Sequence, residues 1–259
     1  MAEDSLPLPI APRRLRLEWV SQVLFRPRQA FKQIMQQASG VWITPLLILS
    51  LTTIGRVLAN GWLKQAAAAG GSVTLPPGFE YYSPEQQAQF QQAMQATSGP
   101  VFVYVFPVIT GVFGIWVGWL LVSGLVRLVL TMLGGRGDTG SSTNLVAWAS
   151  LPFAVRDLVR LIAMLSTRQM LQATGLEGFA SLEPTKLNAY LAAFLALVDI
   201  YVIWHIVLLV IGVRASSSLS SGKAWIGVSV TILLVLALQA LLRFLVGQLS
   251  GMTVISPFF

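Results

Sequence analysis

Long apolar runs are the feature that most constrains the fold of this chain. Five segments hold the roughly 20 mostly apolar residues that a helix needs to cross about 30 Å of hydrocarbon. They cover residues 41–62, 101–133, 144–166, 188–212 and 224–248. Only 10% of the residues are charged, against about 25% in soluble domains. The sequence therefore predicts an all-α, polytopic integral membrane protein, a compact bundle of five transmembrane helices.

The runs also set the domain organisation. Residues 1–40 form a cytoplasmic tail with an interfacial amphipathic helix, 41–249 the five-span domain with an outer-face segment at 63–99, and 250–259 a C-terminal tail. The first residues lack the apolar core and cleavage site of a signal peptide, so the first span is expected to remain in the mature protein. The chain has no cysteine, which excludes disulfides, thiolate metal sites and cysteine nucleophiles.

Basic residues cluster just before the first span. The net charge is +7, and the cluster consists of Arg13, Arg14, Arg16, Arg26, Arg28 and Lys32. Such clusters mark the cytoplasmic side, so we expect the N-terminus inside and the C-terminus outside. The cluster is expected to contact anionic lipid headgroups or a partner protein rather than nucleic acid.

Two helices are expected outside the spans. LRLEWVSQVLFRPRQAFKQIMQQA has interfacial patterning, with a bend at Pro27 and with Trp19 and Phe25 placed for the headgroup region. SPEQQAQFQQAMQA starts with a capping box of Ser83 and Gln86. This glutamine-rich helix is expected on the outer face, where it covers the bundle or a partner.

Four charged residues, Arg156, Asp157, Arg160 and Asp199, form a cluster inside the third and fourth predicted spans. At about 1.5 Å per residue, Arg156 lies ~18 Å, Arg160 ~24 Å and Asp199 ~21 Å from the cytoplasmic end. Arg156 and Arg160 share a helix face, which predicts a buried salt bridge from Asp199 to one of them. Asp157 could neutralise the other arginine.

The cluster has two interpretations, because intramembrane charges are either paired or functional. It can tie the third and fourth spans together, or it can form a proton or substrate relay along a cavity. The balance of charges favours the tie.

The chain has one histidine, His205, in the same span as Asp199. Their spacing of six residues puts them on faces about 120° apart, which does not fit a helical metal site. No nucleophile motif of the GxSxG type precedes a span, so no catalytic residue, metal or cofactor is expected. His205 is expected to hydrogen-bond or pack within the bundle; a lone axial ligand to a chlorin or haem, or a pH-sensitive group, is the alternative.

The second span carries Gly111, Gly114 and Gly118. The last two have the small-xxx-small spacing that allows helices to approach closely. This strip predicts packing within the bundle or, alternatively, homodimerisation.

Three stretches resemble the Ypt-interacting protein (Yip) family. They are VLFRPRQAFKQI leading into GVWITPLLILS, AWASLPFAVRDLVRL after a glycine turn, and VDIYVIWHIVLLVIG. The resemblance extends from about residue 14 to 249 and implies five spans with a cytoplasmic N-terminus. The short N-terminal region and polar outer segment are similar to prokaryotic members, which implies a cytoplasmic membrane location.

Two functions fit these features. The first is a non-enzymatic scaffold, membrane-organising factor or accessory subunit of a membrane complex, with other membrane proteins or a second copy as partners. The second is a small transporter or permease subunit that uses Asp199, Arg156 and Arg160. A polar cavity that reaches Asp199 would favour transport, and a closed apolar core would favour the scaffold.

Overall fold

The structure, a computed structural model, describes residues 15–37, 40–69, 79–135, 139–171, 175–180 and 185–252, and within these ranges it contains no β-strand. The first half holds α1 (Glu18–Phe25), α2 (Pro27–Met35), α3 (Ile43–Ala69), the short turn η1 (Phe79–Tyr81), α4 (Pro84–Thr97), the π-helical turn η2 (Val101–Val105) and α5 (Phe106–Met132). The second half holds α6 (Thr139–Ala149), α7 (Leu151–Thr167), the turn η3 (Glu177–Phe179), α8 (Lys186–Leu195), α9 (Ile200–Ser216) and α10 (Ser221–Met252). The prediction of an all-α fold is confirmed. The Arg13 and Arg14 positions and the tail from residue 253 lie outside the described residues.

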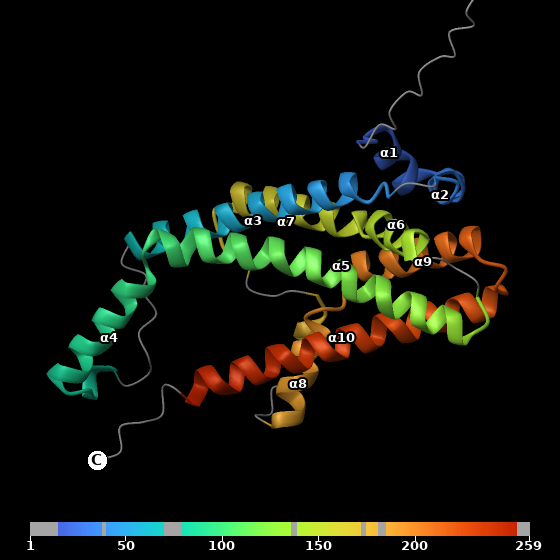
Figure 1. Cartoon of the computed structure of the whole chain (residues 1–259). Coiled ribbons are helices and arrows are strands. Elements are labelled where there is room, and N and C mark those ends of the chain that lie inside the picture. The colour runs from blue at the N-terminus through green and yellow to red at the C-terminus, as the bar shows by residue number, and fades with distance from the viewer. Residues whose placement is uncertain are drawn as a thin grey trace, which may run out of the picture.

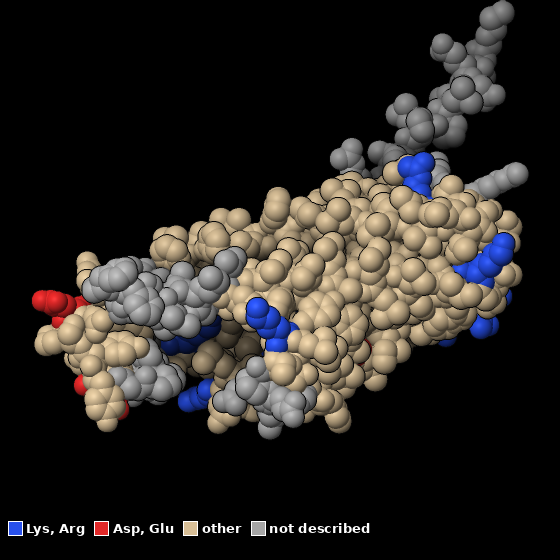
Figure 2. Space-filling view, turned by 90° about the horizontal axis from the view of Figure 1, so that it is seen from below, with Lys and Arg blue, Asp and Glu red and all other residues tan. Residues whose placement is uncertain are grey.

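Three helices are long and apolar enough to cross a membrane: α3, the continuous η2–α5 helix, and α10. The pair α8 and α9 would be a fourth span if its two helices, bent by 62°, count as one. The predicted third span is divided at Ser150 between α6 and α7, and it is not among these candidates. Figure 2 shows a face on which side chains other than Lys, Arg, Asp and Glu predominate. The chain is thus an integral membrane protein, and the count of five spans stays a prediction.

The helices α3, α5 and α7 lie side by side, and α10 packs along α5 (Figure 1). At one end of this bundle α1 and α2 pack against α6 and α9. At the opposite end α4 projects beyond the bundle, and α10 ends on the same side (Figure 1). The capping box of α4 is confirmed: the Ser83 amide donates to Gln86 Oε1 at 3.0 Å, and the Gln86 amide to Ser83 Oγ at 3.3 Å. This helix does not lie along the bundle.

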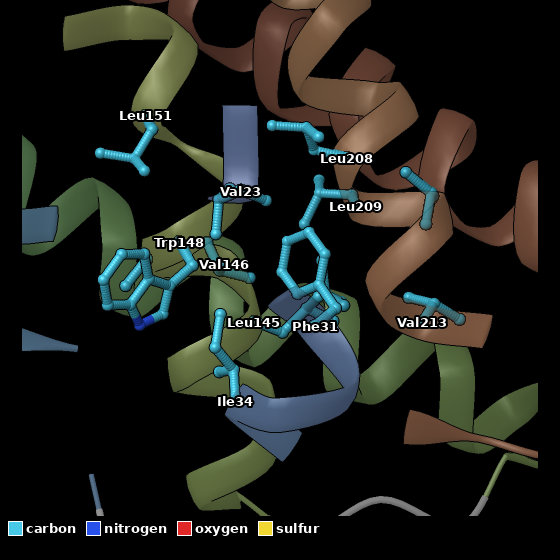
Figure 3. Packing of buried hydrophobic residues seen from close by; sticks show 14 of the residues in the cluster. Val23, Phe31, Ile34, Leu145, Val146, Trp148, Leu151, Leu208, Leu209 and Val213 are labelled. Atoms are coloured by element: carbon cyan, nitrogen blue, oxygen red, sulfur yellow. The ribbon is translucent and has the colours of Figure 1, made fainter. Parts of the chain in front are cut away.

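The chain bends between α1 and α2 at Pro27, as predicted. The apolar face of this pair, however, packs on the protein's own helices. Val23, Phe31 and Ile34 are fully buried, and Figure 3 shows them pointing toward side chains of α6 and α9. Trp19 lies 5.7 Å from the Trp148 ring. Trp19 is therefore buried against the protein, whereas Phe25 is 80% exposed. Their placement in the headgroup region stays a prediction.

Gly212 allows α2, α6 and α9 to meet. A Cβ at this position would lie 2.1 Å from Leu145 Cδ1 and 3.0 Å from Phe31 Cδ1. The helix α6 is also fixed to the residues that precede α3. The Val41 amide donates to Asn144 Oδ1 at 2.9 Å, and Trp148 Nε1 donates to the Val41 carbonyl at 3.1 Å. These contacts join α2, α6, α9 and the residues before α3 at this end of the bundle.

The glycine strip of α5 does not behave as one packing surface. Gly111 faces α3, where a Cβ would lie 3.1 Å from Thr53 Cγ2. At Gly114 and Gly118 a Cβ would meet no atom within 4 Å. The prediction of close packing within the bundle is wrong at these two positions, because no helix side chain lies over them. Homodimerisation through the strip stays a prediction.

Candidate functional site

The site is organised by a break between α8 and α9. The sequence predicts one continuous helix across residues 188–212, but the helix ends at Leu195 and restarts at Ile200. Asp199 is the N-cap of α9, and its Oδ1 accepts from the Val202 amide at 3.0 Å. Aspartate is a preferred residue at this position. It is the one local signal of the break, since no glycine or proline stands there.

A loop satisfies the carbonyl groups that the break exposes. The Leu176 amide donates to the Leu195 carbonyl at 2.9 Å and to the Val198 carbonyl at 3.1 Å. Gly175 takes a left-handed conformation with φ +59°, and a Cβ there would lie 2.6 Å from the Val198 carbonyl oxygen. Only glycine combines this φ with so close an approach. The fold therefore stabilises the break, because the Leu176 amide bonds to carbonyl groups that the helix end leaves without a helical partner.

Asp199 also forms the predicted ion pair, and it does so with both arginines of α7. Its Oδ2 lies 3.3 Å from Arg156 Nη1 and 3.5 Å from Arg160 Nη2. The side chain of Asp199 is 12% exposed. One carboxylate thus caps α9 through one oxygen and joins α9 to α7 through the other.

Asp157 has different partners from those predicted. It is buried, its Oδ1 lies 3.0 Å from Arg56 Nε, and its Oδ2 accepts from the Thr53 hydroxyl at 2.7 Å. The prediction that it neutralises an arginine of its own span is wrong. Asp157 is the residue after Arg156, so it points about 100° away around the helix. That rotation turns it toward α3.

His205 bonds to a backbone carbonyl that the division between α6 and α7 leaves without a helical partner. Pro152 has no amide hydrogen to continue the helix, and the Phe153 amide bonds to the Ser150 carbonyl at 2.9 Å. The carbonyl of Ala149 is left available, and it lies 2.8 Å from His205 Nδ1. A carbonyl can only accept, so Nδ1 carries the proton. His205 thus hydrogen-bonds within the bundle as predicted, and the axial-ligand alternative stays a prediction.

The charged residues surround a chamber, the cavity of about 500 Å³ between α3, α5, α7, α9 and α10. Its polar wall consists of Arg56, Arg156, Arg160, His205, Gln239 and Arg243. Four guanidinium groups line the chamber, whereas Asp157 and Asp199, which pair with three of them, are not among its lining residues. The four arginines exceed the two carboxylates by two positive charges. The face in Figure 2 is hollowed, with Lys or Arg side chains at the hollow.

A smaller space of about 180 Å³ adjoins the chamber; we refer to it as the glycine groove. Its wall includes Gly114 and Gly118 of α5 and Leu46 and Leu49 of α3. The groove and the chamber share five lining residues: Val122, Phe153, Arg156, His205 and Gln239. Gly114 is exposed, so the groove reaches the apolar surface of α5.

The structure brings together the charged residues of the predicted cluster, but not the basic cluster near the N-terminus. Arg26, Arg28 and Lys32 are exposed on α2 or beside it. Arg16 is half-buried, with its amide bonded to Thr44 Oγ1 at 3.0 Å and its guanidinium over Trp19. These residues belong to the end of the bundle where α1 and α2 pack against α6 and α9.

The sequence interpretation missed two members of the chamber, Gln239 and Arg243. For Arg56 it left two alternatives open, extension to the interface or membership of the charged cluster. Arg243 and Arg56 stand toward the outer ends of their predicted spans, where arginine ordinarily extends to the interface. A signal was available for α10: Gln239 and Arg243 are four residues apart and share a helix face. A polar face on so apolar a helix indicates a neighbour or a cavity.

The chemistry of the chamber is that of an anion site. Guanidinium groups bind carboxylates and phosphates through paired hydrogen bonds. A cavity of this size is within the range of about 300–1,000 Å³ typical of ligand sites. Among the described residues, no three His, Asp or Glu side chains form a group that could hold a metal ion.

Comparison with known proteins identifies the family. The family model described as the Yip1 domain matches residues 21–243, which is most of the chain and includes every residue of the chamber. No curated protein and no solved structure is similar to the chain. Because the match extends from α1 to α10, the chain belongs to the Yip1 domain family of membrane proteins.

Proposed function

We propose that this protein is a non-enzymatic membrane protein that binds an anion inside its helical bundle, as a transporter or permease subunit does. The observation that carries the proposal is the excess of positive charge in the chamber. Four arginines line one space of about 500 Å³, and only two aspartates, outside its lining, pair with them. A charge inside a membrane costs about 2.5–3.5 kcal/mol on insertion scales, and excess charge therefore marks a ligand or ion path.

Arg243 is the clearest ligand-binding candidate. Among the described residues no carboxylate lies within 4.0 Å of it, whereas Arg56, Arg156 and Arg160 each have an aspartate. Arg243 and Ala196 also line a second cavity of about 400 Å³, which Glu177 borders. The chamber thus has a neighbouring space on the side where α10 ends, and that space supports a route for a ligand.

Ligand-induced stabilisation tests the anion site. Inorganic phosphate and glycerol phosphate would be added to the full chain in gentle detergent, and unfolding followed by tryptophan fluorescence. A ligand at 100 times its Kd stabilises the folded state by about 2.7 kcal/mol. We expect stabilisation in the native chain and in Arg28→Gln, an exposed position on α2, and its loss in Arg243→Gln. Equal stabilisation of Arg243→Gln and the native chain would contradict the proposal.

Flux then separates a transporter from a protein that only binds. In proteoliposomes, the anion that stabilises the protein should exchange across the membrane, and Asp199→Asn should alter the rate. Binding without exchange would assign the chamber to a non-transporting subunit.

A scaffold or accessory subunit is the second candidate, and α4 favours it. This helix projects beyond the bundle (Figure 1), and its glutamine side chains at positions 89, 91 and 92 are exposed. Purification of the tagged protein in gentle detergent, with mass spectrometry of what accompanies it, tests this candidate. A stoichiometric membrane partner lost on deletion of residues 84–97 would support it. If the protein purifies without a stoichiometric partner, the scaffold or subunit candidate is wrong.

The location proposed with either function is a prokaryotic cytoplasmic membrane, with the N-terminus inside and the C-terminus outside. Exposed Arg26, Arg28 and Lys32 support contact with anionic headgroups on the inner side. Nucleic acid is not among the proposed partners.

A further inference from the structure

We infer that the ligand of the chamber is a phospholipid, with its phosphate among the arginines and one acyl chain in the glycine groove. The inference rests on the proposed anion site and names its substrate class. Two linked spaces of opposite character carry it. The chamber supplies the positive charge. The groove supplies a path to the outer surface of α5 that is mostly apolar, with polar residues including Asp157 in its wall.

The chamber fits a phosphate group. Arg156 and Arg160 lie four residues apart on α7, and each is about one quarter exposed. Their guanidinium groups therefore remain accessible although Asp199 occupies part of each. With Arg243 from α10, donors come from two helices that line the chamber. Guanidinium groups in this arrangement bind a phosphate through several charge-assisted hydrogen bonds.

The groove distinguishes a lipid from a free anion. A soluble anion needs only polar groups, yet the space next to Arg156 continues along apolar side chains, among them Leu46, Leu49 and Ile115. Polar side chains, among them Thr53 and Asp157, also line it, and Asp157 is paired with Arg56. The floor is formed by Gly114 and Gly118, over which no atom lies within 4 Å of a Cβ position. Missing side chains on an apolar helix leave a furrow, and an acyl chain is the occupant that a membrane supplies.

The exposure of the two groove glycines indicates where a lipid would enter the groove. Gly114 is exposed and Gly118 half-buried, so the groove deepens from the surface of α5 toward the chamber. The shared residues Phe153, Arg156 and His205 form the junction. The Arg156 guanidinium stands over the Phe153 ring at 4.8 Å, which places a charged group and an apolar ring side by side, as the glycerol region of a lipid requires.

Photolabelling tests the inference. The full chain would be reconstituted in nanodiscs with a phosphatidylglycerol that carries a diazirine in one acyl chain, and labelled peptides mapped by mass spectrometry. We expect labels on α5 around Gly114–Trp119 and on α3 at Leu46 and Leu49. Gly118→Leu should lower this labelling about tenfold, because its side chain fills the groove.

Gly124→Leu is the matched control. It lies on the same helix, is exposed, has no atom within 4 Å of a Cβ position and does not line the groove. It should label as the native chain does. Gly114→Leu provides a second groove variant if Gly118→Leu does not fold. Labelling that is spread evenly along the lipid face of α5, or is unchanged in both groove variants, would overturn the inference.

The outcomes also separate this inference from the anion site itself. If phosphate stabilises the protein in an Arg243-dependent way but the lipid probe does not label the groove, the anion site stands and the lipid inference fails. Groove labelling that falls in Arg243→Gln supports both. If the groove labels equally well in Arg243→Gln and phosphate has no effect, the apolar groove alone binds lipid, and both the headgroup assignment and the anion site fail.

Discussion

Asp199 performs two roles with two oxygens, and substitutions can separate them. Asparagine caps a helix about as well as aspartate, so Asp199→Asn preserves the bond to the Val202 amide and removes only the charge. Arg156 and Arg160 then lose their carboxylate at 3.3 and 3.5 Å. Removal of one partner from a buried pair costs about 3–5 kcal/mol. We expect about 3 kcal/mol, the lower limit, because the chamber leaves both guanidinium groups partly accessible.

Asp199→Ala removes the cap as well and should cost about 1 kcal/mol more. Conversion of Arg156 and Arg160 to methionine in the Asp199→Asn background should restore most of the stability, since replacement of a whole buried network by apolar residues is often neutral. Unfolding free energies from SDS titration, followed by tryptophan fluorescence, measure all three. If both Asp199→Asn and Arg156→Ala unfold like the native chain, the salt bridge does not hold α7 to α9.

Three further predictions concern other parts of the molecule. Gly212→Ala places a Cβ 2.1 Å from Leu145 Cδ1, and it should destabilise the protein by about 1–3 kcal/mol in the same titration; a neutral result would mean that α2 is not seated there. Gly175→Ala, at φ +59° and 2.6 Å from the Val198 carbonyl oxygen, should cost about 1–3 kcal/mol and increase amide exchange at Leu176; unchanged exchange would contradict the role of the loop. Because the chain has no cysteine, single cysteines at Glu85 and Lys223 can report topology with an impermeable maleimide on intact cells. Glu85→Cys should react and Lys223→Cys should not, and the reverse result would invert the proposed orientation.

Much of the fold could be predicted because it depends on local patterns. The apolar runs gave the membrane class, Pro27 the bend before α2, and Ser83 with Gln86 the start of α4. The pairing of Asp199 followed from counting depth along two antiparallel spans, since 1.5 Å per residue locates a charge well enough to find its neighbour. In each of these cases one short segment or one simple geometric rule determined the outcome.

The remainder depended on contacts between distant segments. The partner of Asp157 could not be predicted, because which way a residue faces depends on the neighbour that packs there, and α3 supplied Arg56. The break before Asp199 is stabilised by Leu176, a residue from a loop that sequence reasoning left without a role. The chamber arises from how α10 packs beside α5 and α9. The polar face of Gln239 and Arg243 indicates a neighbour or a cavity, but it does not identify which helices lie opposite.

The ion pairs have a consequence for the order in which the ribosome and the membrane-insertion machinery build this protein. When the segment of α7 emerges, Arg56 is already present to meet Asp157. Asp199 lies 43 residues beyond Arg156. Arg156 and Arg160 are therefore synthesised before their carboxylate partner and stay unpaired until it emerges. Each of them costs about 2.5–3.5 kcal/mol at the middle of a bilayer when unpaired. If α6–α7 forms the predicted third span, this segment should enter the lipid stably only together with α9, as a helical hairpin. A nascent chain that stops before residue 199 should leave this segment outside the hydrocarbon.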